Sequence, residues 1–449
     1  MIGLMGFPRS NPLPLALAAR RDWSEAMAIV AGWKHPVVRV PVGVPLLVVR
    51  DAEAAHAVLV TDASSYEHPW IVRNIMRDAL GEVLFTKEGT AWADDRRRVA
   101  PFFSHANLDR IGAEVATAID DELDTWEAGV VDDVEEALTR LTMRVACRAL
   151  LGVDPRTHPL GRAIDENFRD LLDWLAYRFS NPISPPAVIP TRRNRRLRRA
   201  RAALADALAE VLEERRASQR SQPGDVLDLL LAAQERGEPV TDADIISEAI
   251  GFLFGGHETT ASTLTWALYE LATNQDVQAG VVNEARDVTI AGSSPHDQAQ
   301  RLAFTGRVVD ETLRLYPPGV GIARVATKTT LLLGKRVRRH TIILIAVLPM
   351  QRSPAWPSAD SFDPYRSFPS SRQQPPEGAA GYLPFGWGPR RCLGARFAIT
   401  EARLALAAIC RRWTLEYQSA HPPQLAVVPS LRPRDPLSLR LTPRHADQR

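Results

Sequence analysis

The residues best able to do chemistry form a short loop near the C-terminus, Pro384-Phe385-Gly386-Trp387-Gly388-Pro389-Arg390-Arg391-Cys392-Leu393-Gly394. Its glycines and prolines cannot continue a helix or a strand, so a shaped loop is predicted. Residues 395–406 have a helical pattern, which places Cys392 among unpaired N–H groups at the positive end of a helix. This environment favours the thiolate over the thiol, and Arg390 adds a positive charge nearby.

The spacing Phe-x-x-Gly-x-Arg-x-Cys-x-Gly is filled by Phe385, Gly388, Arg390, Cys392 and Gly394. It resembles the haem-binding loop of the cytochromes P450, in which the thiolate is the axial ligand of haem iron and favours O–O cleavage. The resemblance implies that Cys392 is the metal ligand and that the other four positions bind the cofactor. A small buried cysteine beside a glycine-rich turn is the alternative.

A second candidate segment lies in the middle of a proline-free stretch that begins with a capping-box pattern at Thr241 and Asp244. The stretch predicts a helix of about 33 residues, roughly 50 Å long, ending near Asn274. Gly255 and Gly256 at its centre each cost about 1 kcal/mol relative to alanine, so a local cause is needed. A kink for helix packing is one such cause, and close approach of a flat ligand is another.

The segment Gly255–Thr259 also resembles the P450 pattern (Ala/Gly)-Gly-x-(Asp/Glu)-Thr. The resemblance implies that the two glycines bind the haem and that Glu258 and Thr259 are catalytic, because this acid–alcohol pair delivers protons to bound dioxygen in the family. Gly255 stands where alanine is commoner, which leaves extra room beside the haem.

Two basic positions are candidates for binding carboxylates of the cofactor. Trp92 and Arg96 are four residues apart and share one helix face. They match the family's Trp-x-x-x-Arg, whose indole N–H and guanidinium hold a haem propionate, and Arg324 is implied as a second propionate partner. Without the resemblance, an exposed basic helix end is the simpler interpretation.

The pair Glu311 and Arg314 places opposite charges on one face of a helix. The pattern Glu-x-x-Arg is weak alone, because Glu213 and Arg216 share it. The family resemblance adds Arg366, in a Phe-x-Pro-x-Arg segment, and implies a buried structural triad. Gln351 stands where the family usually has histidine, and little consequence is expected.

Bulky apolar residues in several segments could line a substrate pocket, although core packing explains them equally well. The candidates are Trp70, Ile75, Phe168, Leu172, Phe252, Val320 and Ile322. Cys147 has the surroundings of a core residue.

The rest of the chain predicts a single domain, residues 1–449, that is mostly α-helical with a small β region. Helices are expected within 107–152 and 160–180, and a helix over 52–60 is capped by Asp51. Residues 37–42 and 46–49 predict a hairpin, and 328–333 and 341–348 predict further strands. The fold expected from the resemblance is P450-like, with the long central helix over the haem.

Charge and cysteine content exclude several classes of protein. The net charge is +2, and the arginine run at 192–201 is followed by acidic residues, so a solvated helix face is favoured over nucleic-acid binding. The three cysteines form no Cys-x-x-Cys, which predicts neither a disulfide scaffold nor a zinc site. Neither a membrane anchor nor a signal peptide is indicated at the N-terminus, and a cytoplasmic location is expected.

The resemblance implies a monooxygenase with haem b that uses dioxygen to hydroxylate a small apolar organic substrate, such as a biosynthetic natural product. Electrons would come from a ferredoxin-like donor and its reductase, since a fused reductase domain is not expected. A basic face formed by Arg96, Arg97, Arg98, Arg390, Arg391 and Arg396 would suit an acidic donor, and a monomer is expected. Oxidative C–C or C–N coupling on the same fold is an alternative. A haem-binding sensor or carrier is another, but it would not need the acid–alcohol pair.

Overall fold

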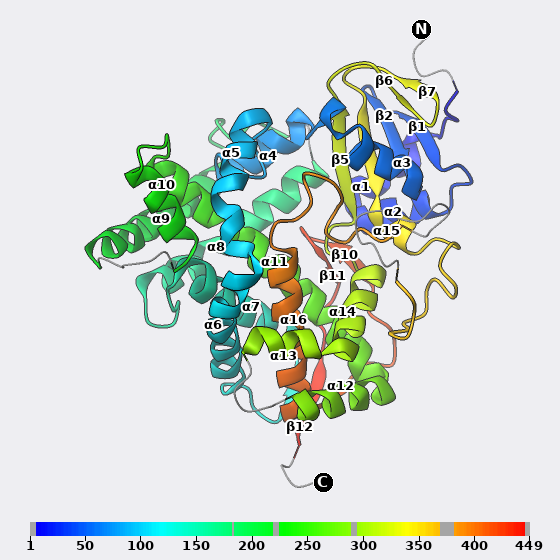
Figure 1. Ribbon diagram of the computed structural model, residues 1–449. Coiled ribbons are helices and arrows are strands. Elements are labelled where there is room, and N and C mark those ends of the chain that lie inside the picture. The colour runs from blue at the N-terminus through cyan, green and yellow to red at the C-terminus, as the bar shows by residue number, and fades with distance from the viewer. Residues whose placement is uncertain (1–5, 182–183, 219–223, 289–293, 369–380, 445–449) are drawn as a thin grey trace.

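The computed structural model describes residues 6–181, 184–218, 224–288, 294–368 and 381–444, and most of these residues are helical (Figure 1). The prediction of one domain over 1–449 includes residues outside these ranges and stays a prediction. The helices are α1 (Pro12–Arg21), α2 (Trp23–Ala31), α3 (Ala52–His56), α4 (Trp70–Leu80), α5 (Gly89–Val99), α6 (His105–Leu123), α7 (Val134–Leu151), α8 (Pro159–Ser180), α9 (Arg192–Ala217), α10 (Val226–Glu235), α11 (Asp242–Thr273), α12 (Gln275–Val288), α13 (Pro295–Arg301), α14 (Ala303–Leu315), α15 (Val347–Gln351) and α16 (Ala395–Arg412).

The larger sheet has the strand order β1-β2-β8-β5-β3. The strands are β1 (Val37–Pro41), β2 (Pro45–Val49), β8 (Ile342–Ala346), β5 (Gly321–Ala326) and β3 (Tyr66–Glu67). The β1–β2 hairpin is confirmed, with Val37 opposite Val49. Only the β2–β8 pair is parallel. The sheet lies at one end of the molecule, beside α1, α2 and α3 (Figure 1).

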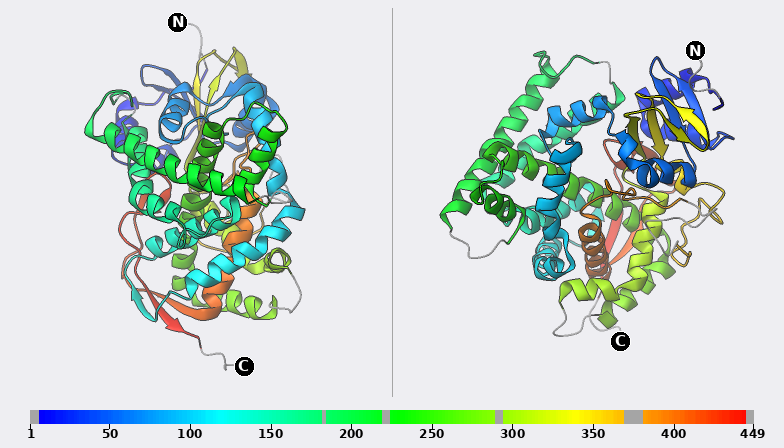
Figure 2. Two further views of the ribbon diagram at one scale, coloured as in Figure 1. Left: turned by 90° about the vertical axis from the view of Figure 1, so that its left-hand side faces the viewer. Right: turned by 45° about the horizontal axis from the view of Figure 1, so that its top comes forward.

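Three smaller sheets complete the β structure. They pair β6 (Thr330–Leu332) with β7 (Lys335–Val337), β10 (Leu425–Val427) with β11 (Leu431–Pro433), and β12 (Leu439–Pro443) with both β4 (Gly129–Val131) and β9 (Trp413–Tyr417). The strand β12 lies at the end of the molecule opposite the larger sheet, as the views in Figure 2 agree.

The helix α11 has the limits that the sequence predicts. The Thr241 hydroxyl accepts a hydrogen bond from the Asp244 N–H, and the Asp244 carboxylate accepts one from the Thr241 N–H, so both halves of the capping box form. The helix ends with Asn274 as its C-cap. It packs against α7, α9, α14 and α16, which places its centre in the middle of the helical part.

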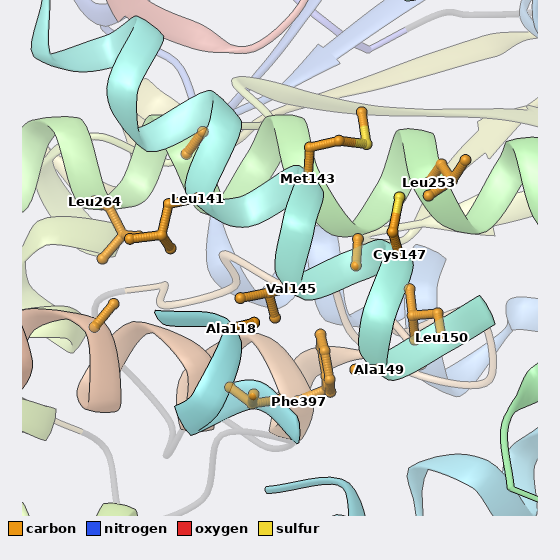
Figure 3. Close-up of a cluster of buried hydrophobic side chains, with 14 of the residues drawn as sticks. Ala118, Leu141, Met143, Val145, Cys147, Ala149, Leu150, Leu253, Leu264 and Phe397 are labelled. Atoms are coloured by element: carbon orange, nitrogen blue, oxygen red, sulfur yellow. The ribbon is translucent and has the colours of Figure 1, made fainter. Parts of the chain in front are cut away.

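The main hydrophobic core lies where α7 packs against α11 and α6, with α16 close by (Figure 3). Leu141 and Cys147 of α7 face Leu253 and Leu264 of α11, and Phe397 of α16 lies on the other side (Figure 3). Cys147 is fully buried there, which confirms its prediction as a core residue. No helix that the structure describes is both long and apolar enough to cross a bilayer.

Two segments differ from the sequence prediction. The Asp51-capped helix ends at His56 and continues as a π-helix, Ala57–Thr61, which turns the carbonyl of Leu59 toward the cysteine loop. The strand predicted over 341–348 ends at Ala346, where the chain enters the short helix α15.

Candidate functional site

The cysteine loop has the irregular backbone that its composition predicts. Gly386 and Gly388 have φ of 69° and 73°, in the left-handed region that other residues avoid. A Cβ atom on Gly388 would lie 1.9 Å from the carbonyl oxygen of Leu59, so only glycine fits there. The Cys392 N–H donates to the carbonyl of Phe385 at 2.9 Å, which closes the loop, and Gly394 is the N-cap residue of α16.

Cys392 is exposed as a residue, although protein atoms surround its thiol. Burial raises the pKa of the thiol, and the Gly394 N–H, Arg391 and Arg96 oppose this shift. The direction of this shift is opposite to the prediction that the surroundings of Cys392 favour the thiolate, and the positive charges that lower the pKa belong to Arg391 and Arg96, not to Arg390. A metal cation bound to the sulfur would supply the missing stabilisation, because coordination deprotonates thiols outright.

One face of α11 borders open space at the centre of the molecule. Gly255 and Thr259, one turn apart, are exposed although their helix crosses the core. A Cβ atom on Gly255 would meet nothing within 4 Å, and the Thr259 hydroxyl donates to the Gly255 carbonyl at 3.0 Å. Gly256 instead faces α7, where its Cβ position lies 3.3 Å from Leu150. Of the two glycines, Gly255 is the one that faces open space, and cofactor binding stays a prediction for both.

Phe103 connects this face to the cysteine loop. Its ring centroid lies 6.1 Å from that of Phe252, one turn before Gly255, and its Cε1 atom lies 3.6 Å from the Cβ position of Gly394. On the strand β5, Ile322 comes within 3.5 Å of the Cβ position of Gly386. The helix α11, the strand β5 and the cysteine loop therefore meet around one site.

Glu258 is buried on another side of α11 from Thr259. Burial raises the pKa of its carboxyl to about 7, while Arg432 and hydrogen bonding to Ser430 lower it and Glu135 raises it further. Burial lowers the pKa of the neighbouring His257 to about 4, so His257 is neutral at pH 7 and does not form an ion pair with Glu258. Arg432, Ser430 and Glu135 are distant from Glu258 in the sequence, so the motif could not predict that they act on it.

A basic cluster lies beside the cysteine loop. Arg96 donates to the Arg391 carbonyl at 3.2 Å, and the Arg390 guanidinium lies 4.2 Å from the Trp92 ring centroid. Arg390 also forms an ion pair with Glu88. Arg324 is buried, and burial, followed by repulsion from Arg390, lowers its pKa to about 10. Arg96, Arg324 and Arg390 are each predicted to bind the cofactor, and the structure brings the three together.

The cluster includes two residues that the sequence reasoning missed. His68 is buried, and its N–H and Nδ1 lie 3.0 and 2.8 Å from the Glu88 carboxylate. Burial lowers the pKa of His68, which keeps it neutral at pH 7. Neither residue belongs to a recognisable motif, so spacing could not have revealed them.

The charges of the cluster do not balance among the described residues. The three guanidinium groups of Arg96, Arg324 and Arg390 are matched by the single carboxylate of Glu88, and no described carboxylate lies within 4.0 Å of Arg96 or Arg324. Two positive charges therefore remain in a largely buried position. Such a cluster fits a ligand with two carboxylates, since a buried charge requires a partner.

The basic face predicted for an electron donor is only partly present. Arg97 is exposed, with 75% of its side chain accessible, and Arg396 is exposed at the start of α16. Arg96 and Arg390 turn inward to the cluster instead, and Arg98 is largely buried against Asp95 and Glu238.

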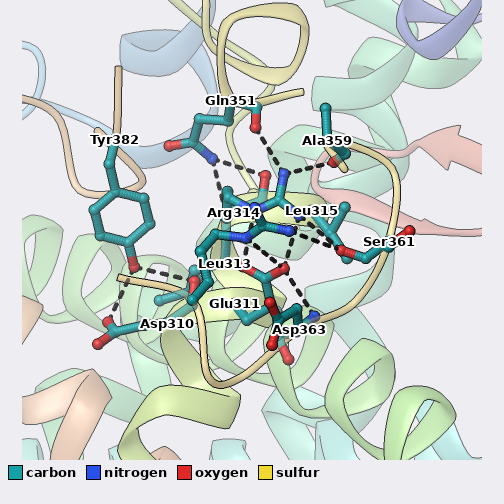
Figure 4. Close-up of polar contacts among 12 residues, drawn as sticks. Asp310, Glu311, Leu313, Arg314, Leu315, Gln351, Ala359, Ser361, Asp363 and Tyr382 are labelled. Atoms are coloured by element: carbon teal, nitrogen blue, oxygen red, sulfur yellow. Dashed lines mark hydrogen bonds and ion pairs between the residues drawn. The ribbon is translucent and has the colours of Figure 1, made fainter. Parts of the chain in front are cut away.

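The predicted triad of Glu311, Arg314 and Arg366 forms. Glu311 and Arg314, which Figure 4 shows, are fully buried. Arg314 donates from Nε and Nη2 to the two Glu311 oxygens at 2.7 and 2.8 Å, and Arg366 donates to Glu311 at 3.2 Å. The remaining Arg314 donors bond to the carbonyls of Gln351, Ala359 and Ser361.

The Gln351 side chain forms hydrogen bonds with two segments. Its amide donates to the carbonyls of Leu313 and Arg314 at the end of α14, at 2.8 and 3.1 Å. Its oxygen accepts from the Leu383 N–H at 2.8 Å, just before the cysteine loop. This side chain therefore connects the triad helix to the segment just before the loop that carries Cys392, and the expectation that glutamine in place of histidine has little consequence stays a prediction.

The predicted pocket residues do not share one environment. Phe252 and Ile322 border the site, whereas Trp70 is 62% exposed at the start of α4 and Val320 packs with residues of α1 and α2. Ile75, Phe168 and Leu172 pack in or against the main core, and the Phe168 ring lies 4.9 Å from that of His257. A role in substrate binding stays a prediction for all seven.

Comparison with known proteins gives a consistent result. A family model described as cytochrome P450 matches residues 33–440. Cyclooctatin synthase of Streptomyces melanosporofaciens is 36% identical over 371 residues, which cover 81% of this chain and 79% of that protein. Pentalenene oxygenase of Streptomyces avermitilis is 32% identical over 83% of this chain and 82% of that protein. The crystal structure of the cytochrome P450DA heme domain aligns with a TM-score of 0.76 and 25% identity, covering 93% of this chain and 91% of that chain.

Proposed function

The chain belongs to the cytochrome P450 family, and from this premise we propose that it hydroxylates an apolar, largely hydrocarbon substrate at a cysteine-bound haem b. It is a monooxygenase and therefore an oxidoreductase. The observation that carries the choice of a haem is the basic cluster, because Arg96 and Arg324 have no carboxylate partner among the described residues and would pair with two propionates.

The residues present fit this cofactor. The Cys392 sulfur would hold the iron, and Arg96, Arg324 and Arg390 would hold the carboxylates. Gly255 leaves space on the α11 side, where a side chain would intrude. When bound, a thiolate haem supplies the one-electron and dioxygen chemistry of the reaction.

The chain itself contributes proton handling. Thr259 carries a hydroxyl on the open face of α11, and its hydrogen bond to the Gly255 carbonyl holds that hydroxyl in place. Glu258 has a carboxyl pKa of about 7, so near neutral pH it can both hold and release a proton. Phe252 and Phe103 flank the open face with apolar surface, which limits the access of water.

The substrate class is taken from the names of relatives. Pentalenene oxygenase and cyclooctat-9-en-7-ol 5-monooxygenase, the latter 32% identical over 78% of this chain, are named for an unsaturated hydrocarbon and for an unsaturated alcohol. We infer a substrate of this kind here, a cyclic hydrocarbon or an alcohol made from one. The apolar residues Phe252 and Ile322 beside the site are consistent with it.

Electrons are proposed to come from a small acidic ferredoxin-like protein and its reductase. The exposed Arg97 and Arg396 support this choice, because opposite charges accelerate encounter. A reduction rate that does not fall as salt rises would argue against it.

The test begins with spectroscopy of the purified protein. We expect the red-shifted carbon monoxide complex of a thiolate haem, and a pyridine haemochrome spectrum that identifies haem b. A panel of cyclic hydrocarbons and their alcohols is then screened for shifts of the Soret band, and hits are incubated with a surrogate redox pair. Products that gain one oxygen atom support hydroxylation, whereas products that lose two hydrogens and contain a new C–C or C–N bond indicate oxidative coupling. Absence of the thiolate spectrum would overturn the proposal.

A further inference from the structure

The segment between α4 and α5, residues 81–88, is here called the connector. On one side it is bound to the cysteine loop: Arg390 donates to the Lys87 carbonyl at 2.7 Å and pairs with the Glu88 side chain. Glu88 in turn accepts hydrogen bonds from His68. The connector therefore fixes the position of Arg390 within the basic cluster.

The connector is also bound to α11, through a carboxylate that the proposed mechanism does not use. Glu248 is buried on α11, and its Oε1 lies 3.7 Å from the Lys87 Nζ. The backbone N–H of Leu84 also favours the ionised carboxylate. Lys87 forms a closer ion pair with Asp95 of α5, so its ammonium is shared between α5 and α11.

Glu248 faces a cavity of about 320 Å³ between α5, α10 and the first turns of α11. The charged groups that line it are Lys87 of the connector, Asp94, Asp95 and Arg98 of α5, and Asp244 and Glu248 of α11. Glu238, just before α11, reaches the same network through Arg98. The Oε1 of Glu248 is buried and has no hydrogen-bond partner in the part of the chain that the structure describes. The attraction between Glu248 and Lys87 is therefore that of an ion pair, and it depends on the charge of Glu248.

We propose that Glu248 is a positioning residue for the cofactor site: it holds the connector against α11 through Lys87, and thereby holds Glu88 and Arg390 where a cofactor carboxylate binds. The proposal rests on the proposed haem-binding function. Glu248 itself touches neither Cys392 nor the basic cluster in any contact described above. Its effect is therefore transmitted through the backbone of residues 84–88.

Because Glu248 is buried, the strength of the Lys87–Glu248 ion pair depends on pH. Burial raises the pKa of the Glu248 carboxyl to about 7, with Lys87 and the Leu84 N–H opposing and Asp95 adding to the shift. Above pH 7 the carboxylate is charged and holds Lys87, whereas below pH 7 it is neutral and the link weakens. Cofactor retention should therefore rise as the pH rises through 7.

The experiment compares Glu248→Gln with Glu238→Gln, a matched control that removes a carboxylate from the same network without touching the connector. Haem transfer to excess apomyoglobin is measured from pH 5.5 to 8.5. We expect the native protein to lose haem about tenfold more slowly at pH 8.5 than at pH 5.5, the change that one pKa unit of coupling produces. Glu248→Gln should lose haem at every pH as fast as the native protein does at pH 5.5. Glu238→Gln should show the same change of rate with pH as the native protein. Glu258 titrates in the same range, so Glu258→Gln is included and should also show this change of rate.

A second measurement separates this proposal from the haem-binding function. Amide hydrogen exchange of residues 81–88 is followed in haem-free protein at pH 8, where no cofactor takes part. We expect faster exchange in Glu248→Gln than in the native protein or in Glu238→Gln. A native change of haem-loss rate with pH in Glu248→Gln, or unchanged exchange of the connector, would overturn the positioning role. A protein that shows no thiolate haem but does show the exchange difference would instead overturn the proposed function and leave the link standing.

Discussion

Replacing Glu311 with alanine should destabilise the protein severely, because the side chain is fully buried and accepts hydrogen bonds from three residues. Two bonds come from Arg314, one from Arg366 and one from the Asp363 N–H. Removing the carboxylate leaves the Arg314 charge in the core, held there by the carbonyls of neighbouring loops.

The expected magnitude follows from this geometry. Breaking a buried ion pair by removing one partner costs about 3–5 kcal/mol. Natural domains have a total stability of about 5–15 kcal/mol, so the variant would keep only part of it. Glu311→Gln keeps the shape and one acceptor oxygen but turns an amide toward the same donors, and about 1–3 kcal/mol is expected.

The assay is urea unfolding followed by far-UV circular dichroism, with loss of the Soret band recorded in parallel. Because Gln351 joins the triad helix to the segment before the cysteine loop, the haem signal should be lost at lower urea than in the native protein. The control is Glu213→Ala, which has the same Glu-x-x-Arg spacing, but Glu213 is exposed and Arg216 pairs with Asp242. A change within about 0.5 kcal/mol is expected there.

The result that would refute the reasoning is a Glu311→Ala protein with the urea midpoint of the Glu213→Ala control. A normally folded variant with altered product selectivity would equally show that the triad acts in catalysis and not in stability.

Three further predictions concern the site. Cys392→Ala should abolish the thiolate-type carbon monoxide spectrum, whereas Cys147→Ala and Cys410→Ala should retain it, since both are buried in the core. Thr259→Ala should still bind haem and accept electrons, but its ratio of product to reductant consumed should fall, because acid–base assistance is worth about 10²–10⁴-fold; an unchanged ratio would make Thr259 a packing residue. Burial raises the pKa of Glu258 from its ordinary 4.5 to about 7, so the native state holds a proton that the unfolded chain releases in this window. Its contribution to stability should therefore fall as the pH rises from 4.5 to 7, and Glu258→Gln should reduce the pH slope of stability in thermal unfolding, leaving the part that Glu248 contributes. An unaltered slope would show that Glu258 does not titrate in this range.

The sequence alone determined the local features of the site. Positive φ at Gly386 and Gly388 follows from composition, because a loop that turns sharply before a helix needs residues without a Cβ atom. The limits of α11 follow from Thr241 and Asp244, since a capping box is made within four residues. Spacing also paired Glu311 with Arg314, because residues three apart meet on any helix.

Only the tertiary structure decided which charges meet across the chain. Six arginines near the site were expected to form one basic face, yet Arg96 and Arg390 turn inward while Arg97 stays outside. Spacing gave no sign of Glu88 or Glu248, because each acquires its role from a partner on another element. The pKa of a carboxyl such as Glu258 depends on burial by segments distant in sequence. Motifs record contacts within a few residues, whereas burial and long-range charge pairing exist only after the chain has folded.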